Sequence, residues 1–276
     1  MTLIIGMAKA DGIYMSVDYR VTNSVTGGLI DDDAVKFLDV TYPPEDGPRA
    51  LFAFTGIARL RDGTPVGDWM RETLRGITED FQTNMLHLRD RLDRDIAKYR
   101  SPLIINVLVA WGERRAFGAL TNVKADMKTV APSFAIQIQE LTEPIAFFNG
   151  SGWHAAFAGG HMASLERQLN ILPRNPWSHM KLLATVNRRV AEADPTGPVS
   201  PFCNVAFVGT GPKYSQMTTS RAFCRPGESV TFRMPLILYG IDASFPAEQL
   251  WQSMQEERDP SPASSEDHNR HLQRRP

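Results

Sequence analysis

The sequence predicts an α+β fold in which two β-sheets are flanked by layers of helices. Short β-rich runs and amphipathic stretches follow one another in the order strands, helices, strands, helices, strands, which is typical of sheets covered by helices. The composition is that of a folded protein, because 42% of the residues are hydrophobic and 22% are charged. We expect one domain over residues 1–253. The polar tail 254–276 is predicted to be disordered, because it holds too little apolar area to offset the entropy of ordering.

The first 56 residues are predicted to form one antiparallel β-meander. Two β-rich runs, 2–8 and 13–19, are separated by a polar turn that ends in Gly12, and such a turn signals a hairpin. Runs 36–42 and 50–55 repeat the pattern around the turn-rich segment PPEDGP.

A pair of amphipathic helices is predicted next. Thr64 and Pro65 have the form of an N-cap and a first helical residue, so one helix is expected to begin there. A second helix is expected to begin near Thr78. Its buried face is predicted from side chains that recur at spacings of four and three, namely Phe81, Met85, Leu88, Leu92 and Ile96.

The remainder of the domain is predicted to supply a second sheet and a second pair of helices. Segment 103–111 is apolar enough for a strand that is buried on both faces, and we expect the second sheet to begin there. Further strands are predicted over 115–121, 134–139, 145–148, 203–209, 214–221 and 230–239. The two helices are predicted over about 153–170 and 178–193.

Charge and cysteine content exclude several classes of function. Thirty Lys and Arg residues against thirty-one Asp and Glu give a formal net charge of −1, so no broad field attracts nucleic acid or an anionic membrane. Cys203 and Cys224 lack the spacing of metal ligands and are interpreted as free thiols in a reducing compartment. The chain begins without a basic signal-peptide region and has no apolar run of about 18 residues. We expect a cytoplasmic protein, and no cofactor or metal is indicated.

Short motifs in the first third of the chain single out Thr2. This residue begins the first predicted strand, and the hairpin leads to Ser16-Val17-Asp18-Tyr19-Arg20-Val21-Thr22. The stretch strongly resembles the opening of proteasome β-subunits, in which a nucleophilic threonine begins the first strand and a hairpin brings an A-x-D-x-R-x-T-like motif beside it. Lys36, followed by Phe37, resembles the lysine that the family carries on its next strand.

The resemblance extends to about residue 210. Phe54-Thr55-Gly56 resembles the turn that forms the oxyanion hole, and Gly150-Ser151-Gly152 resembles the G-S-G that opens the third helix. A weaker match relates Asp194 and Ser200 to the family's D-x-x-S-G-G segment. The resemblance implies the four-layer αββα sandwich of N-terminal-nucleophile (Ntn) hydrolases. It also implies that Arg20 braces the first strands, and that three residues hydrogen-bond around the terminal amine: Ser151, Asp194 and Ser200.

The chemistry of these residue types agrees with the resemblance. A neutral hydroxyl needs an adjacent base, and a chain-terminal threonine carries one in its α-amine, whose ordinary pKa is about 7.7 to 8.0. Lys36 would hold that pKa down, while Asp18 would pair with Lys36 and orient it. Thr2 would attack an amide carbonyl as the N–H of Gly56 stabilises the oxyanion. Because Thr2 follows Met1, a methionine aminopeptidase is expected to expose it.

Each motif also has an interpretation without catalysis. Asp18 and Arg20 are compatible with a solvated surface pair, Lys36 with a neutraliser of the acidic turn 31–33, and Gly150–Gly152 with an ordinary helix start.

Two spacings depart from the family pattern. Lys36 lies two residues further from the nucleophile than is usual, so the loop 22–35 must absorb an insertion. The segment PTGPV separates Asp194 from Ser200, where the family has two residues, and Pro201-Phe202 replaces the glycine pair.

The resemblance implies a threonine peptidase that cuts peptides or unfolded chains. It also implies a homo-oligomeric ring, for which the helix face of 78–98 would suit subunit contacts. Two alternatives stay open: a catalytically inactive proteasome-like scaffold subunit, and a small-molecule amidase of the same fold. The presence of Thr2, Asp18 and Lys36 argues against the first alternative. The sequence does not separate peptide from small-amide substrates.

Overall fold

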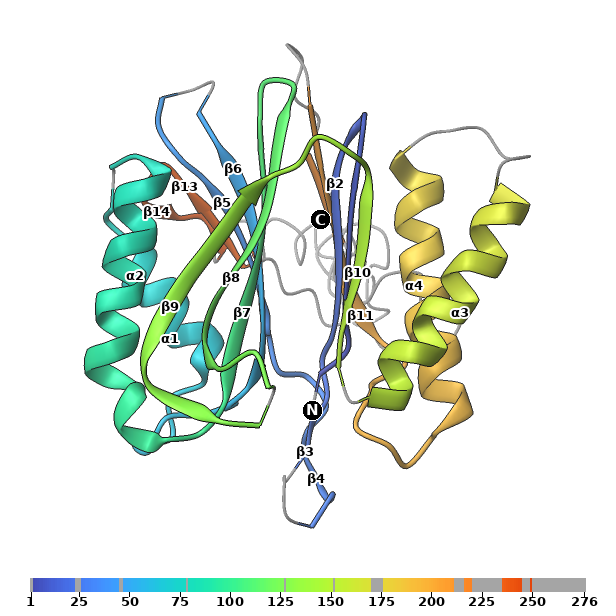
Figure 1. Ribbon diagram of the computed structural model, residues 1–276, viewed down its shortest axis with the longest axis horizontal. Coiled ribbons are helices and arrows are strands. Elements are labelled where there is room, and N and C mark those ends of the chain that lie inside the picture. The colour runs from blue at the N-terminus through green and yellow to red at the C-terminus, as the bar shows by residue number, and fades with distance from the viewer. Residues whose placement is uncertain are drawn as a thin grey trace, which may run out of the picture.

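Two β-sheets pack face to face between two pairs of helices (Figure 1). The computed structural model describes residues 2–22, 26–44, 47–77, 79–126, 128–150, 152–169, 176–210, 216–219, 235–244 and 249. The predicted tail 254–276, Ser151 and Cys224 lie outside the described residues.

A five-stranded antiparallel sheet carries the beginning of the chain. Its order is β10 (Ile145–Asn149), β1 (Ile4–Lys9), β2 (Gly12–Asp18), β11 (Cys203–Gly209) and β12 (Gln216–Thr219). The predicted first hairpin is confirmed, since β1 pairs with β2 and Lys9 lies opposite Gly12. The central position of β2 explains why all seven of its residues are buried.

A seven-stranded sheet faces the first one. Its order is β14 (Ile241–Asp242), β13 (Leu236–Leu238), β5 (Phe37–Thr41), β6 (Arg49–Gly56), β7 (Leu103–Trp111), β8 (Arg114–Val123) and β9 (Val130–Glu140). Strand β13 runs parallel to β5, whereas the other neighbours in this sheet are antiparallel.

Two predictions about these sheets are wrong. The first 56 residues do not form one meander, because β1–β2 and β5–β6 belong to different sheets. The second sheet also does not begin at residue 103, because β7 pairs with β6 along its length. The chain changes sheet earlier, through a small hairpin of β3 (Val21–Thr22) and β4 (Leu29–Asp31). Strand β7 is mostly buried, as predicted.

Helices cover the outer face of each sheet. The seven-stranded sheet is covered by α1 (Val66–Leu74) and α2 (Phe81–Asp95), which a short 3-10 turn η1 (Ala97–Tyr99) follows. The five-stranded sheet is covered by α3 (Gly152–Leu169) and α4 (Pro176–Ala193) (Figure 1). None of the described helices is both long enough and apolar enough to span a bilayer.

The helix starts differ from the prediction, but the predicted buried face is present. Pro65 occupies the N-cap position of α1, one residue later than expected, and makes no side-chain cap. Helix α2 begins at Phe81, where the Asp80 carboxylate caps the Thr83 N–H at 3.0 Å. The α2 face of the prediction is buried at four of its five positions, namely Met85, Leu88, Leu92 and Ile96.

Three apolar layers hold the elements together. One lies between α1–α2 and the seven-stranded sheet, one between the two sheets, and one between the five-stranded sheet and α3–α4. Burial of apolar side chains in all three layers is the main stabilising contribution. The middle layer fixes the distance between the two sheets. That distance determines whether side chains at the end of one sheet can reach those at the end of the other.

Candidate active site

Thr2 and Asp18 lie at one end of the first hairpin. Thr2 precedes β1 and Asp18 is the last residue of β2, so antiparallel pairing brings them together. The Leu3 N–H donates to the Oδ1 atom of Asp18 at 2.8 Å, and the Asp18 N–H donates to the Leu3 carbonyl at 3.3 Å. Both Thr2 and Asp18 are buried. The peptide that follows Thr2 is therefore fixed against the Asp18 carboxylate.

Lys36 reaches the same carboxylate from the facing sheet. It directly precedes β5, and its Nζ atom lies 3.4 Å from the Oδ2 atom of Asp18. The Nζ atom also donates to the Arg20 carbonyl oxygen. The side chains of Lys36 and Asp18 are 3% and 0% exposed, so the pair is shielded from water. The small β3–β4 hairpin occupies the longer loop before Lys36 and leaves the lysine in reach of Asp18.

The surroundings of the pair shift both pKa values. Burial raises the pKa of Asp18, against the opposing effects of the Lys36 charge and of N–H donors from Ser200, Leu3 and Arg20. Burial likewise lowers the pKa of Lys36, against the opposing charge of Asp18. Three backbone N–H groups fix the orientation of the Asp18 carboxylate. Besides the Leu3 N–H, the Arg20 N–H donates to it at 2.9 Å and the Ser200 N–H at 3.2 Å.

Gly56 ends β6 and adopts a backbone conformation that suits only glycine. Its φ angle is +113°, and an added Cβ would lie 2.0 Å from the Pro102 carbonyl oxygen. The residue itself is exposed. The backbone before β7 thus leaves no room for a side chain at position 56. The predicted role of Gly56 in an oxyanion hole stays a prediction.

The G-S-G segment passes the backbone of Thr2. An added Cβ at Gly150 would lie 3.3 Å from the Thr2 carbonyl oxygen and 3.5 Å from the Leu3 side chain. Gly152 then begins α3. Ser151 lies outside the described residues, so its predicted contact with the terminal amine stays a prediction.

Arg20 connects the loop before Lys36 to the segment between α4 and β11. Its guanidinium donates to both carboxylate oxygens of Asp32, at 3.0 and 3.3 Å. It also donates to the carbonyl oxygens of Pro195 and Gly197, at 3.3 and 2.9 Å. Arg20 therefore ties the loop over 194–200 to Asp32, and its predicted bracing of the first strands stays a prediction.

The two residues at the ends of this loop differ in what they contact. Ser200 is fully buried and reaches Asp18 with its backbone N–H, while its Oγ atom accepts from the Phe202 N–H at 3.3 Å. The carboxylate of Asp194 lies 3.2 Å from the Nε2 atom of His154. Participation of Asp194 and Ser200 at a free terminal amine stays a prediction.

Several residues around the site were not identified from the sequence. The Tyr19 hydroxyl donates to Asn204 at 2.5 Å, and Asn187 donates to the Ser200 carbonyl oxygen at 2.8 Å. His154 contacts Asp194 as described. Only Asn187 could have been noticed in the sequence, because it is an amide on the buried face of α4, beside Val186 and Val190.

A cleft of about 160 Å³ adjoins the site. Part of its wall is the segment before Lys36, and another part is the segment after Gly56. Four charged side chains line it: Asp31, Asp33, Asp68 and Arg59. Within the described part of the chain, no group of three His, Cys, Asp or Glu side chains is placed to hold a metal ion.

Comparison with known proteins finds similarity in structure but not in sequence. No model of a known protein family matches the chain, and no curated protein matches it. Among solved structures, the Anbu (Gly-1) mutant from Hyphomicrobium sp. strain MC1 has a TM-score of 0.51 at 9% identity, over 95% of this chain and 97% of that chain.

Two further solved structures are more distant. Anbu (ancestral beta-subunit) from Yersinia bercovieri has a TM-score of 0.48 at 8% identity, over 81% of this chain and 88% of that chain. Eukaryotic HslV from Trypanosoma brucei has a TM-score of 0.41 at 15% identity, over 74% of this chain and 97% of that chain.

The likeness to the first Anbu structure is one of fold alone, because so few residues are identical. Together with the layer order, it shows that the chain has the four-layer αββα fold of Ntn hydrolases. The predicted fold class is confirmed. The roles of Thr2 and its neighbours are not decided by fold.

Proposed function

We propose that this chain is a proteasome-like threonine amide hydrolase in which Thr2, exposed by removal of Met1, is the nucleophile. The observation that carries the proposal is the buried ion pair of Asp18 and Lys36 against the first residues of the chain. Asp18 accepts from the Leu3 N–H at 2.8 Å and lies 3.4 Å from the Lys36 Nζ atom. Burying two charges is unfavourable unless they are paired and hydrogen-bonded. Activation of Thr2 would explain why this buried pair lies beside the first residues of the chain.

The ion pair supports activation of the Thr2 hydroxyl. Once Met1 is removed, the α-amine of Thr2 is a base within the same residue and accepts the Oγ proton during attack. The Asp18 carboxylate, 3.4 Å from the Nζ atom, opposes the effect of burial on the pKa of Lys36 and favours the charged ammonium. A positive charge on Lys36 holds down the pKa of the α-amine and keeps it available as a base.

The reaction is an acyl transfer in two steps. The Oγ atom of Thr2 bonds to the amide carbonyl carbon, the C–N bond breaks, and the amine leaves with the proton taken from Oγ. Water then attacks the ester, which releases the acid and restores the hydroxyl. The Gly56 N–H is proposed to stabilise the oxyanion in both steps, and the tight geometry at Gly56 supports that role.

The cleft beside the site supports a peptide substrate over a small amide. Its volume of about 160 Å³ offers room for one side chain, and its wall includes Ala58 and Arg59, which follow Gly56 in the chain. Three carboxylates and one guanidinium line it. Asp31 pairs with Arg59 and Asp68 with Arg71, each at 3.3 Å, so one negative charge is left in excess and favours a basic side chain. Fluorogenic peptides that differ only in the residue before the scissile bond test this, and preference for an acidic residue there contradicts it.

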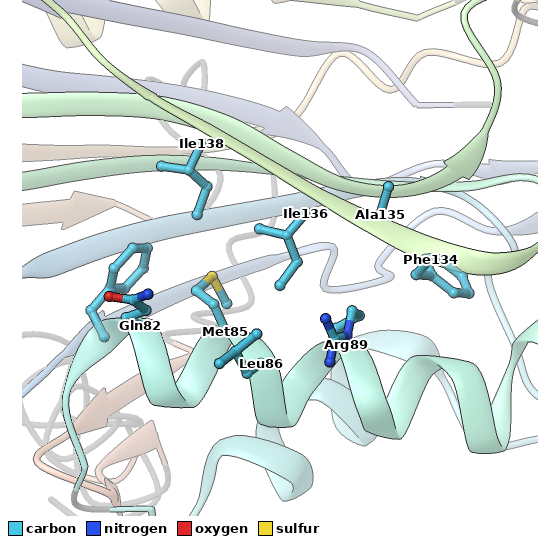
Figure 2. A pocket seen from close by; sticks show the side chains of 9 residues that line it. Gln82, Met85, Leu86, Arg89, Phe134, Ala135, Ile136 and Ile138 are labelled. Atoms are coloured by element: carbon cyan, nitrogen blue, oxygen red, sulfur yellow. The ribbon is translucent and has the colours of Figure 1, made fainter.

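We also propose that copies of the chain assemble into a ring. A groove of about 520 Å³ runs between α2 and the edge strand β9, and Figure 2 shows their side chains facing one another across it. Leu86 is 42% and Ile138 36% exposed, and contact with a second copy would bury them. Native mass spectrometry and electron microscopy test this proposal. Leu86→Asp is expected to dissociate the assembly, whereas the exposed neighbour in His87→Asp leaves it intact.

Intact mass and covalent labelling test the nucleophile. An epoxyketone bonds to both the hydroxyl and the α-amine of an N-terminal threonine, so it reports both groups at once. We expect a mass that lacks Met1 and a single adduct. The adduct is expected to disappear in Thr2→Ala and to remain in Thr2→Ser.

Thr185→Ala is the matched control, because it removes a hydroxyl on α4 that donates to the Lys181 carbonyl. Labelling that survives in Thr2→Ala, or a correctly processed chain that does not label, rejects the proposal. The second result favours the inactive scaffold.

A further inference from the structure

We infer that His154 is a positioning residue for the proposed reaction: with Asp194, it holds the loop 194–200 so that the Ser200 N–H stays on the Asp18 carboxylate. The inference rests on the proposed function, in which Asp18 matters as the partner of Lys36. His154 acts through the loop and does not itself touch the substrate.

His154 joins two elements that lie on either side of the site. It is in the first turn of α3 and is 3% exposed, and its Nε2 atom lies 3.2 Å from the Oδ2 atom of Asp194. Asp194 directly follows α4. Two residues before α3, Gly150 passes the Thr2 carbonyl oxygen. The contact therefore ties the end of α4 to the helix that begins beside the nucleophile.

The loop is held at its start, middle and end. His154 holds its first residue, Arg20 donates to two carbonyl oxygens in its middle, and Asn187 donates to the Ser200 carbonyl at its end. Ser200 in turn donates its N–H to Asp18 at 3.2 Å. His154 is the side-chain anchor that comes from α3, so it sets the loop relative to the Thr2 side of the site.

The length of the loop explains why such an anchor is needed. Five residues, PTGPV, separate Asp194 from Ser200, and a longer loop loses more entropy when its ends are fixed. The Asp194 carboxylate packs over the turn, since an added Cβ at Gly197 would lie 2.0 Å from its Oδ2 atom. The Gly197 N–H donates to the Asp194 carbonyl at 3.0 Å. Fixing this carboxylate through His154 therefore fixes the turn.

Hydrogen exchange at the Ser200 amide tests the anchor without any activity. His154→Leu removes the contact but keeps an apolar side chain at a buried position, while His154→Gln keeps an N–H that can donate to Asp194. We expect the Ser200 amide to exchange roughly tenfold faster in His154→Leu. The rate is expected to stay near that of the wild type in His154→Gln.

Two further variants make the exchange result decisive. His161→Leu is the control, because that ring lies two turns further along α3 and packs on Phe157. Asp194→Asn changes the other partner at a position that is 30% exposed, so it is expected to fold if His154→Leu does not. Unchanged exchange at Ser200 in a folded His154→Leu variant overturns the inference, and so does unchanged exchange in Asp194→Asn where His154→Leu does not fold.

Kinetics then separate positioning from general stability. In His154→Leu we expect kcat for an amide substrate to fall about 10- to 100-fold with KM unchanged, because the site is displaced while the substrate cleft is not. His154→Gln is expected to restore most of kcat. A change in KM alone, or equal losses in both variants, overturns the inference. An inactive wild-type chain rejects the proposed function, while the exchange comparison still decides the role of His154.

Discussion

The Lys36 Nζ atom lies 3.4 Å from the Oδ2 atom of Asp18, although the two residues come from different sheets. Both side chains are buried, so each is the counter-charge that keeps the other tolerable in the interior. The pair also links the sheets at the end where the chain begins. Changes to the pair are therefore expected to alter the free energy of unfolding as well as the activity of the proposed site.

Removing one partner of the pair is expected to destabilise the protein more than removing both. Asp18→Asn or Lys36→Met alone leaves a buried charge without its partner and is expected to lower the free energy of unfolding by about 3–5 kcal/mol. The double variant is expected to lose less than either single variant, because it leaves neither charge without its partner. Urea denaturation of the four proteins measures this coupling. Strictly additive losses mean that the pair has no energetic coupling.

The same four proteins are expected to differ in the pH dependence of stability. The folded-state pKa of Asp18 lies above its ordinary value of 3.8. Its contribution to stability is therefore present below 3.8 and is lost as pH rises through the folded-state value. The folded-state pKa of Lys36 lies below its ordinary value of 10.5. Its contribution is therefore present above 10.5 and is lost as pH falls through the folded-state value.

The wild type should thus be least stable, relative to the double variant, at intermediate pH. Its relative stability is expected to rise toward pH 10.5 and toward pH 3.8. Buried Tyr14 and Tyr42 also have raised pKa values, but they are present in both proteins and cancel in the difference. Denaturation curves between pH 4 and 10 provide the measurement. A difference that does not vary with pH contradicts the two shifts.

Local periodicity predicted the helices better than it predicted the sheets. The α2 face was evident because Met85, Leu88 and Leu92 recur with the period of a helix, and all three are buried. The strands were mostly found, but their partners were not, since pairing joins residues far apart in sequence. Nothing local distinguishes β5, which pairs with β6 and β13, from a third strand of the first hairpin.

Residues of the candidate site were identified from the sequence only where they belong to a recognisable motif. Thr2, Asp18 and Lys36 were identified from their resemblance to a family, and the structure brings Asp18 and Lys36 into contact. The contacts of His154 with Asp194 and of Tyr19 with Asn204 could not be predicted. They join residues 40 and 185 positions apart, and single polar residues carry no pairing signal of their own.

The predicted α2 face has a direct test in stability. Leu88 is fully buried between α2 and the seven-stranded sheet, so Leu88→Ala is expected to lower the free energy of unfolding by about 2–5 kcal/mol. The exposed neighbour His87 is the control, and His87→Ala is expected to change it by less than about 0.5 kcal/mol. Chemical denaturation measures both. Similar small effects at the two positions indicate that α2 does not pack as described.

Gly56 offers a test that separates backbone strain from the chemistry proposed there. Gly56 and Gly63 both have positive φ angles, +113° and +90°, but an added Cβ meets the Pro102 carbonyl oxygen only at Gly56 and nothing within 4 Å at Gly63. Gly63→Ala is therefore expected to cost roughly 1–2 kcal/mol from conformation alone, and Gly56→Ala more than that, because the chain must also move away from Pro102.

The two variants are also expected to differ in kcat, and by more than their difference in stability explains. In Gly56→Ala the displaced N–H no longer supports the oxyanion, so kcat is expected to fall about 10²- to 10³-fold at a temperature where the protein is still folded. Gly63→Ala is expected to keep wild-type kcat under the same conditions. Peptide hydrolysis assayed alongside circular dichroism makes the comparison. A folded Gly56→Ala variant with full activity means that the N–H of residue 56 is not an oxyanion donor, and the proposed turn then has a structural role only.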